Sequence, residues 1–209
     1  FNRDYNSDLA WDSNWSNTAT WGDYDNDGAL DLFVANGGDG EANCLYHNLG
    51  DGTFETMYNS SIASETGARG ASWGDYDNDG YLDLYVANSS EANANNSLFH
   101  NNGDGSFSQI GVGWIVFDND DSQTPTWCDY DNDGDLDMYV VNCGPNALYR
   151  NEGGGTFTKI QTGVLVADGY CSNGASWADY DNDGDFDVFV TSGDDHSNRL
   201  YQNQGGGVF

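Results

Sequence analysis

Cations are scarce in this chain. Its 209 residues include 5 lysines and arginines against 35 aspartates and glutamates, which gives a formal net charge of -30 at pH 7. The five cations are scattered along the sequence, at Arg3, Arg69, Arg150, Lys159 and Arg199. So acidic a surface repels the phosphates of nucleic acids and of anionic membranes. We therefore expect neither of them as a partner.

Long apolar runs are also missing. None approaches the 18 or so residues that a membrane-spanning helix requires, so we expect no membrane insertion. No signal peptide precedes Phe1, which opens in the middle of a repeat, and we expect the chain to be a processed or excised portion. High charge can indicate disorder, but 14% aromatic residues and 28 glycines favour ordered, turn-rich β structure.

What the sequence does contain is one acidic segment, repeated four times. The copies begin at Trp21, Trp73, Trp127 and Trp177. Each has aspartate at loop positions 1, 3, 5 and 9, glycine at position 6, and a variable position 7 that can offer a backbone carbonyl. Positions 1, 3, 5, 7 and 9 of the four copies are Asp23, Asp25, Asp27, Ala29, Asp31, Asp75, Asp77, Asp79, Tyr81, Asp83, Asp129, Asp131, Asp133, Asp135, Asp137, Asp179, Asp181, Asp183, Asp185 and Asp187.

These loops predict a calcium site. Four carboxylates within nine residues repel one another unless a hard cation accepts their oxygens. Ca2+ takes six to eight such ligands in a flexible geometry, whereas Mg2+ prefers a rigid octahedron and keeps its waters. An EF-hand would need a glutamate at position 12, where these copies have valine, as at Val34 and Val86. We predict about one Ca2+ per repeat. The alternative is a solvated acidic turn without metal.

A second motif follows each acidic segment. It reads N-x-L-[YF]-x-N-x-G-x-G-x-F at residues 43–54, 96–107, 146–157 and 198–209. A period near 50 residues with many short strands is typical of β-propeller blades rather than of helical solenoids. We predict an all-β, single-domain chain, 1–209, with repeats at approximately 1–53, 54–106, 107–156 and 157–209.

The second repeat shows the strands expected in one blade. We predict four antiparallel strands, at Gly70–Trp73, Asp83–Asn88, Ser97–Asn101 and from Phe107 onward. In the second of these, alternation places Leu84 and Val86 on one face and Tyr85 on the other.

With the D-x-D-x-D-G-x-x-D signature, the apolar strand and the N-x-G-x-G-x-F motif repeated four times, the chain resembles the FG-GAP or VCBS-type repeats of the integrin α-subunit propeller and of many secreted proteins. This resemblance spans essentially all 209 residues. It implies a β-propeller with a structural calcium ion in each blade, and roles in adhesion or glycan recognition. The integrin-like propeller has seven blades. A small closed ring, part of a larger propeller and an open array therefore all remain open for four repeats.

The two ends have the same repeat phase, at Phe1 and Phe209. We expect the strand after Phe1 to complete the blade that ends at Phe209, either within a ring or head to tail from a neighbouring copy. Asp4 stands where the second repeat has Met57, which predicts a modified or more exposed role for the first copy.

Cysteines and sequons predict an extracellular protein. The even set Cys44, Cys128, Cys143 and Cys171 lacks C-x-x-C spacing, which disfavours zinc and permits disulfides. We favour the Cys143–Cys171 pair, which could meet at one end of adjacent blades, over buried free thiols. N-glycosylation patterns occur at Asn14, Asn59, Asn88 and Asn95, although an Asn- and Ser-rich chain produces some by chance. Calcium modules of millimolar affinity also suit the outside of the cell.

Catalytic patterns are weak. His47 and His100 share a repeat phase with Arg150 and Gln202, so we interpret them as blade-surface residues. His196 has no nucleophile in a recognisable frame. A single stretch with three further acids is interpreted as a solvated loop: Asp118, Asp120 and Asp121. We predict that the chain is not an enzyme. A propeller domain of a calcium-dependent polysaccharide-degrading enzyme stays as an alternative.

Three tryptophans lie outside the repeated phase, Trp11, Trp15 and Trp114. Their flat faces suit sugar rings, although they could equally pack between blades, as we expect the four repeated tryptophans to do. We predict an extracellular, calcium-stabilised repeat module for adhesion or self-assembly, with a protein or glycan of the cell surface or matrix as partner and head-to-tail association as a second mode. A glycan-binding lectin-like propeller is the alternative.

Overall fold

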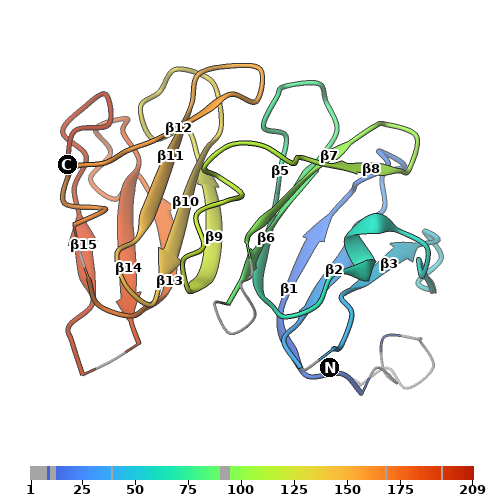
Figure 1. Ribbon diagram of the computed structural model, residues 1–209. Coiled ribbons are helices and arrows are strands. Elements are labelled where there is room, and N and C mark those ends of the chain that lie inside the picture. The colour runs from blue at the N-terminus through green and yellow to red at the C-terminus, as the bar shows by residue number, and fades with distance from the viewer. Residues whose placement is uncertain (1–8, 10–12, 39, 90–94, 168, 194) are drawn as a thin grey trace.

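The computed structural model describes residue 9 and residues 13–38, 40–89, 95–167, 169–193 and 195–209. In this part of the chain the fold is all-β, with four antiparallel sheets side by side in an arc (Figure 1). Each sheet is a meander whose consecutive strands are hydrogen-bonded neighbours. The predicted blade architecture is confirmed.

Equivalent strands of the four blades have nearly the same lengths. The first contains β1 (Ser16–Gly22), β2 (Asp31–Asn36), β3 (Cys44–Asn48) and β4 (Phe54–Thr56). The second contains β5 (Ala68–Gly74), β6 (Asp83–Asn88), β7 (Ser97–Asn101) and β8 (Phe107–Gln109). The third contains β9 (Ser122–Cys128), β10 (Asp137–Asn142), β11 (Ala147–Asn151) and β12 (Phe157–Lys159). The fourth contains β13 (Ser172–Ala178), β14 (Asp187–Ser192) and β15 (Arg199–Tyr201).

The arc does not close on itself. The first and fourth sheets lie at its two ends, with the second and third between them (Figure 1). The small closed ring that the sequence left open is therefore wrong for these four repeats. The strand expected after Phe1, including Asp4, lies outside the described residues. A single-turn 3-10 helix, Ser61–Ser64, leads from the first blade to the second, and no described helix is long and apolar enough to cross a membrane.

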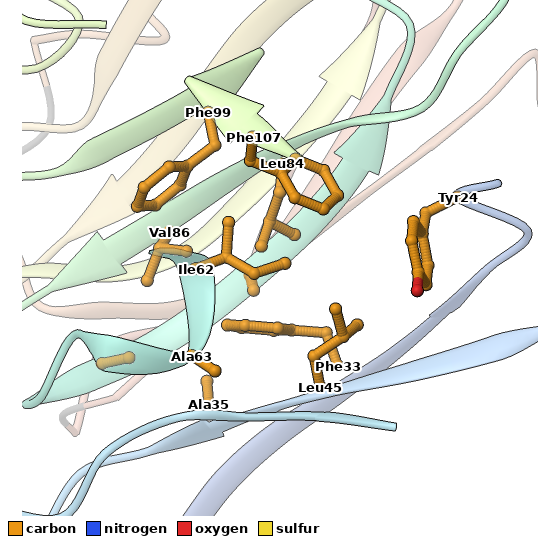
Figure 2. Close-up of a cluster of buried hydrophobic side chains, with 12 residues drawn as sticks. Tyr24, Phe33, Ala35, Leu45, Ile62, Ala63, Leu84, Val86, Phe99 and Phe107 are labelled. Atoms are coloured by element: carbon orange, nitrogen blue, oxygen red, sulfur yellow. The ribbon is translucent and has the colours of Figure 1, made fainter. Parts of the chain in front are cut away.

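The second strand of an inner blade is buried on both faces. In β6, Leu84 and Val86 pack into the core shared with the first blade, whereas Tyr85 and Ala87 pack into the core shared with the third. The predicted alternation is therefore present, but both faces of β6 are buried, because the second blade has a neighbour on either side. Figure 2 shows the first of these cores, in which Ile62 lies between Leu84 of the second blade and Phe33 and Leu45 of the first.

An aromatic clamp closes each joint between blades. The tyrosine of one acidic segment, Tyr24, lies between Trp73 and Phe107 of the next blade, with ring centroids 6.3 and 5.7 Å apart. The next joint repeats this geometry for Tyr76 between Trp127 and Phe157, at 6.3 and 5.7 Å. Stacked and edge-on aromatic pairs add stabilisation beyond the area that they bury. These clamps therefore fix the spacing of the blades.

Small residues make the clamp possible. A Cβ on Gly74, at the end of β5, would lie 2.6 Å from the ring of Trp127. A Cβ on Gly155 would lie 2.5 Å from the ring of Tyr76, and this glycine also has φ +73°. Any side chain at either position would push the clamp apart, which explains why glycine stands there.

One repeated tryptophan is not a core residue. Trp21 is 53% exposed, whereas Trp73, Trp127 and Trp177 are partly buried against the preceding blade. The prediction that all four are core residues is therefore wrong for Trp21. Its blade is the first described one, so no described blade precedes it with a tyrosine for Trp21 to cover.

The third and fourth blades are also joined covalently. Cys143, just after β10, and Cys171, just before β13, form a disulfide. Cys44 and Cys128 are not part of this disulfide, and burial raises the pKa of Cys128 to about 12.

We expect Cys143→Ser to lower the free energy of unfolding by roughly 3 to 4 kcal/mol, the loop-closure estimate for a sequence separation of 28 residues. Urea denaturation of the oxidised chain and the variant measures this loss. Cys44→Ser, which changes a cysteine outside this disulfide, is the control. Equal stabilities for the oxidised and reduced wild-type chain would contradict the expectation.

Candidate metal centres

Each acidic loop connects the first and second strands of its blade, and its position-9 aspartate begins the second strand. These four aspartates are almost completely buried: Asp31, Asp83, Asp137 and Asp187. In the second blade, Oδ2 of Asp83 accepts a hydrogen bond from the backbone N–H of Tyr76 at 3.1 Å, and Oδ1 accepts one from Asn101 at 2.8 Å. The other three blades repeat both bonds. Position 9 therefore ties the loop to the third strand.

Positions 1 and 5 shape the turn. The carboxylate of Asp75 accepts hydrogen bonds from the N–H groups of Asp79 at 3.0 Å and Gly80 at 2.9 Å, and Asp79 in turn accepts one from Tyr81 at 2.9 Å. Gly80 has φ +92° and Asn78 φ +61°, so the chain reverses within three residues. The same bonds recur in every blade, which makes the loop geometry a property of the repeat.

Carboxylate oxygens converge inside the turns. Ligand atoms lie within 4.8 Å of one another in several groups, among them Asp23–Asp25–Asp27, Asp75–Asp77–Asp79 and Asp129–Asp131–Asp137. The structure thus brings together, in the first three blades, several of the carboxylates that the sequence predicted as ligands. The position-7 residues lie in the same turns, donating their N–H groups to position 5.

The gathered carboxyls resist ionisation. Burial raises the pKa of Asp83 and that of Asp137 to about 7, against the lowering effect of their backbone hydrogen bonds, and the nearby Asp77 and Asp131 carboxylates add to the rise. The pKa values of Asp77 and Asp131 are also raised, first by burial and then by the position-5 aspartates. Without a counter-ion, concentrating these charges therefore costs free energy.

The residues fit a calcium ion. One carboxylate oxygen, Oδ1, is buried without a hydrogen-bond partner in both Asp77 and Asp131, each at loop position 3. An unpaired buried carboxylate oxygen is costly unless a cation binds it. Carboxylate oxygens are the kind of donor that Ca2+ prefers.

Calcium-free chain is expected to lose stability as the pH rises from about 4 to about 7. The folded pKa values of Asp83 and Asp137 exceed the ordinary value of 3.8, so the folded state binds more protons than the unfolded chain in this window, and rising pH favours unfolding. The stabilising contribution is fully present below the unfolded pKa. Urea midpoints in chelator across this range measure the slope. Asp83→Asn with Asp137→Asn should flatten it, and a midpoint that climbs with pH would contradict the prediction.

Two histidines lie beside the loop carboxylates, and the sequence analysis did not predict this. His47 and His100 were interpreted as blade-surface residues, but each lies against the loop carboxylates of its own blade. The interpretation is therefore wrong. Their position on the third strand, one residue before the asparagine that bonds position 9, could have indicated it.

The stretch from Asp118 to Asp121 is not simply a solvated loop. Asp118 accepts hydrogen bonds from the hydroxyl of Tyr149 and from Nζ of Lys159, which lies 2.6 Å from its Oδ1. The same Nζ lies 3.6 Å from Oδ2 of Asp120, whose pKa burial raises to about 6. Lys159, on β12, reaches this stretch and pairs with its carboxylates, which is why the stretch is not fully solvated.

The predicted glycosylation acceptors differ in their surroundings. Asn59 and Asn95 are exposed, and Asn14 is partly buried. Asn88 is buried at the end of β6, and its amide nitrogen donates to the backbone oxygen of Asn95 at 2.8 Å. A glycan needs that nitrogen and open space, so the prediction for Asn88 is wrong.

Of the three tryptophans outside the repeat phase, two can be placed. Trp15 is 75% exposed and Trp114 is 64% exposed, so neither packs between blades. Trp11 lies outside the described residues. His196 stacks on Tyr170, with ring centroids 3.7 Å apart, away from the acidic loops.

The chain matches the model of the FG-GAP-like repeat at residues 23–86, 79–140 and 129–190, and it belongs to this family. These matches include the acidic loops of all four blades. No curated protein matches the chain.

A solved structure with a similar fold is that of an Agrocybe aegerita lectin that specifically recognises non-reducing terminal N-acetylglucosamine. It is 19% identical, with a TM-score of 0.58, and the likeness covers 93% of this chain and 51% of the lectin. The chain thus spans about half the length of that protein. At this identity the likeness shows the fold alone.

Proposed function

We propose that the chain is an extracellular, calcium-stabilised interaction module, without catalytic activity, that associates head to tail with a second copy of itself. The observation that carries the proposal is that the fourth blade exposes the tyrosine of an aromatic clamp, while the first blade exposes Trp21 of the pair that would receive one.

The fourth blade offers the tyrosine half. Tyr180 is 50% exposed, whereas its counterparts Tyr24, Tyr76 and Tyr130 are almost fully buried by the blade that follows each of them. Phe189 and Leu200 on the same blade are also exposed, although their counterparts in the first three blades are buried. The outer face of the fourth blade therefore carries exposed aromatic and apolar side chains that a further blade could bury.

The first blade offers the other half. Trp21 and Phe54 have ring centroids 6.2 Å apart. The equivalent pair that holds Tyr24, formed by Trp73 and Phe107, is 6.0 Å apart. The receiving pair is therefore already arranged, and a contact that joins unlike ends of identical chains produces linear growth when it does not close.

Charge opposes this association. With one Ca2+ per repeat the net charge is still about -22 (-30 + 8), so copies repel one another at low salt. Calcium and moderate salt should both favour assembly.

Analytical ultracentrifugation of the chain over a range of concentrations, in calcium and at two salt levels, tests the proposal. We expect species that grow with concentration, and their loss in Tyr180→Ala and in Trp21→Ala. Tyr58→Ala is the control, since this side chain is also exposed but has no place in the clamp. A chain that stays monomeric throughout contradicts head-to-tail association.

Glycan binding is the second candidate, and a pocket on the second blade favours it. This pocket has a volume of about 580 Å³ and is lined by Glu65, Asn95, Gln109 and Phe117, among others. One carboxylate oxygen of Glu65, Oε2, is buried without a hydrogen-bond partner, and the Phe117 ring is half exposed. A carboxylate beside an aromatic face suits a sugar ring and its hydroxyls. The lectin of similar fold, and the exposed Trp114, are in keeping with this candidate.

A glycan array probed with the wild-type chain and with Glu65→Gln in calcium tests this candidate. Binding to one class of sugar that the variant loses would support it. An array without signal, or a signal unchanged in the variant, would remove this pocket as a glycan site.

A further inference from the structure

The four loops are not alike, because two of them have a histidine beside their carboxylates. His47 lies on β3 and His100 on β7, while the same position holds Arg150 in the third blade and Gln202 in the fourth. We infer that the first two blades form mixed nitrogen–oxygen sites that take Zn2+ or a similar borderline metal in preference to Ca2+, whereas the last two are all-oxygen calcium sites. This inference rests on the proposal that the loops hold metal.

The geometry of the first blade is that of three ligands around one ion. Nδ1 of His47 lies 3.3 Å from Oδ2 of Asp25 and is hydrogen-bonded to Oδ1 of Asp31 at 3.1 Å. Zinc binds imidazole nitrogen and carboxylate oxygen at about 2.0 to 2.2 Å, so neighbouring ligand atoms lie roughly 3 to 3.5 Å apart. The three atoms therefore need little movement to bind one ion.

The second blade repeats this arrangement, but there the histidine nitrogen makes no hydrogen bond. Nδ1 of His100 lies 3.2 Å from Oδ2 of Asp77 and 3.3 Å from Oδ1 of Asp83. Yet this nitrogen is buried without a hydrogen-bond partner, and so is Oδ1 of Asp77. A nitrogen that lies within ion-pair distance of two carboxylates, without a hydrogen bond to either, is placed as a metal ligand is placed.

Packing fixes the direction of both rings. His47 lies edge-on to Tyr24, with centroids 6.1 Å apart and an interplanar angle of 70°. His100 lies against Tyr76 at 6.3 Å and 69°. Both tyrosines are buried in the clamps between blades, so Nδ1 is aimed at the carboxylates by the core. Groups that orient a ligand in this way raise metal affinity.

The other two blades lack the nitrogen. Arg150 is a cation and cannot bind a metal, and its guanidinium Nη2 is held by both oxygens of Glu152 at 2.6 Å. In the fourth blade, Nε2 of Gln202 donates to Oδ2 of Asp181 at 2.5 Å. Imidazole favours zinc and related metals, whereas carboxylate and carbonyl oxygens favour calcium. The third and fourth blades, which lack the histidine, therefore serve as controls for the first two.

Zinc titration of the calcium-loaded chain tests the inference, with released calcium counted and with NMR of 15N-labelled histidine rings. We expect Zn2+ to displace about two of four Ca2+ and to shift the Nδ1 resonances of His47 and His100, but not those of His196. His47→Gln with His100→Gln should weaken zinc binding at least about tenfold. Gln202→His should add a third zinc site.

These measurements distinguish failure of the zinc preference from failure of metal binding altogether. A chain that binds four Ca2+, but whose zinc binding is unchanged by the histidine substitutions and leaves the ring resonances in place, overturns this inference alone. A chain that binds neither metal overturns the metal-binding proposal as well. Zinc that displaces all four Ca2+ equally also contradicts the difference between the blades.

Discussion

Removing calcium is expected to lower the melting temperature by more than about 20 °C. An ion bound only by the native state stabilises it by about 2.7 kcal/mol per site at 100 times its dissociation constant, so four sites contribute roughly 11 kcal/mol. For a chain of this length each kcal/mol shifts the midpoint by about 2 to 4 °C. The physical cause lies in the loops, where buried carboxyls such as Asp83 and Asp137 must otherwise be protonated or left unpaired.

Thermal unfolding followed by circular dichroism, in millimolar calcium and in chelator, measures this shift. Magnesium at the same concentration is the control, and it should restore only part of the loss because it fits the irregular oxygen cage less well. Superimposed curves with and without calcium would show that the loops are solvated turns.

The second large effect concerns the aromatic clamp. Tyr76→Ala should destabilise the chain by about 3 to 5 kcal/mol, as other buried aromatic-to-alanine changes do, because the ring fills the space between Trp127 and Phe157. The same substitution at Tyr180, where no described blade covers the ring, should cost under about 0.5 kcal/mol.

Urea denaturation of the two variants at low protein concentration makes the comparison direct, since both residues follow the position-1 aspartate of the same motif. Repeat contacts are mainly between neighbours, so hydrogen exchange in Tyr76→Ala should rise most in the second and third blades. Equal losses in the two variants would mean that the tyrosine supports its own loop rather than the joint.

Much of the fold followed from spacing alone. The acidic loop requires a turn at Gly80, and the apolar residues on either side of it alternate as a strand does, so β6 and β7 have the bounds expected for them. The loop carboxylates were predictable for the same reason, since Asp75 and Asp79 are close in sequence and the turn itself brings them together.

What spacing could not show is which blade covers which. The exposure of Trp21 and the burial of both faces of β6 depend on whether a neighbour is present, and that is a property of the array. His100 and Asp118 were misinterpreted for a related reason. Their partners Asp83 and Lys159 are 17 and 41 positions away, in strands whose pairing places them together.

Calcium stoichiometry tests the central claim most directly. Equilibrium dialysis with atomic absorption should find about four Ca2+ per chain, and about three in Asp79→Ala, which removes a loop carboxylate from the second blade. Asp104→Ala removes an exposed carboxylate outside the loops and should leave the number at four. Fewer than one Ca2+ per chain at millimolar calcium would contradict the account.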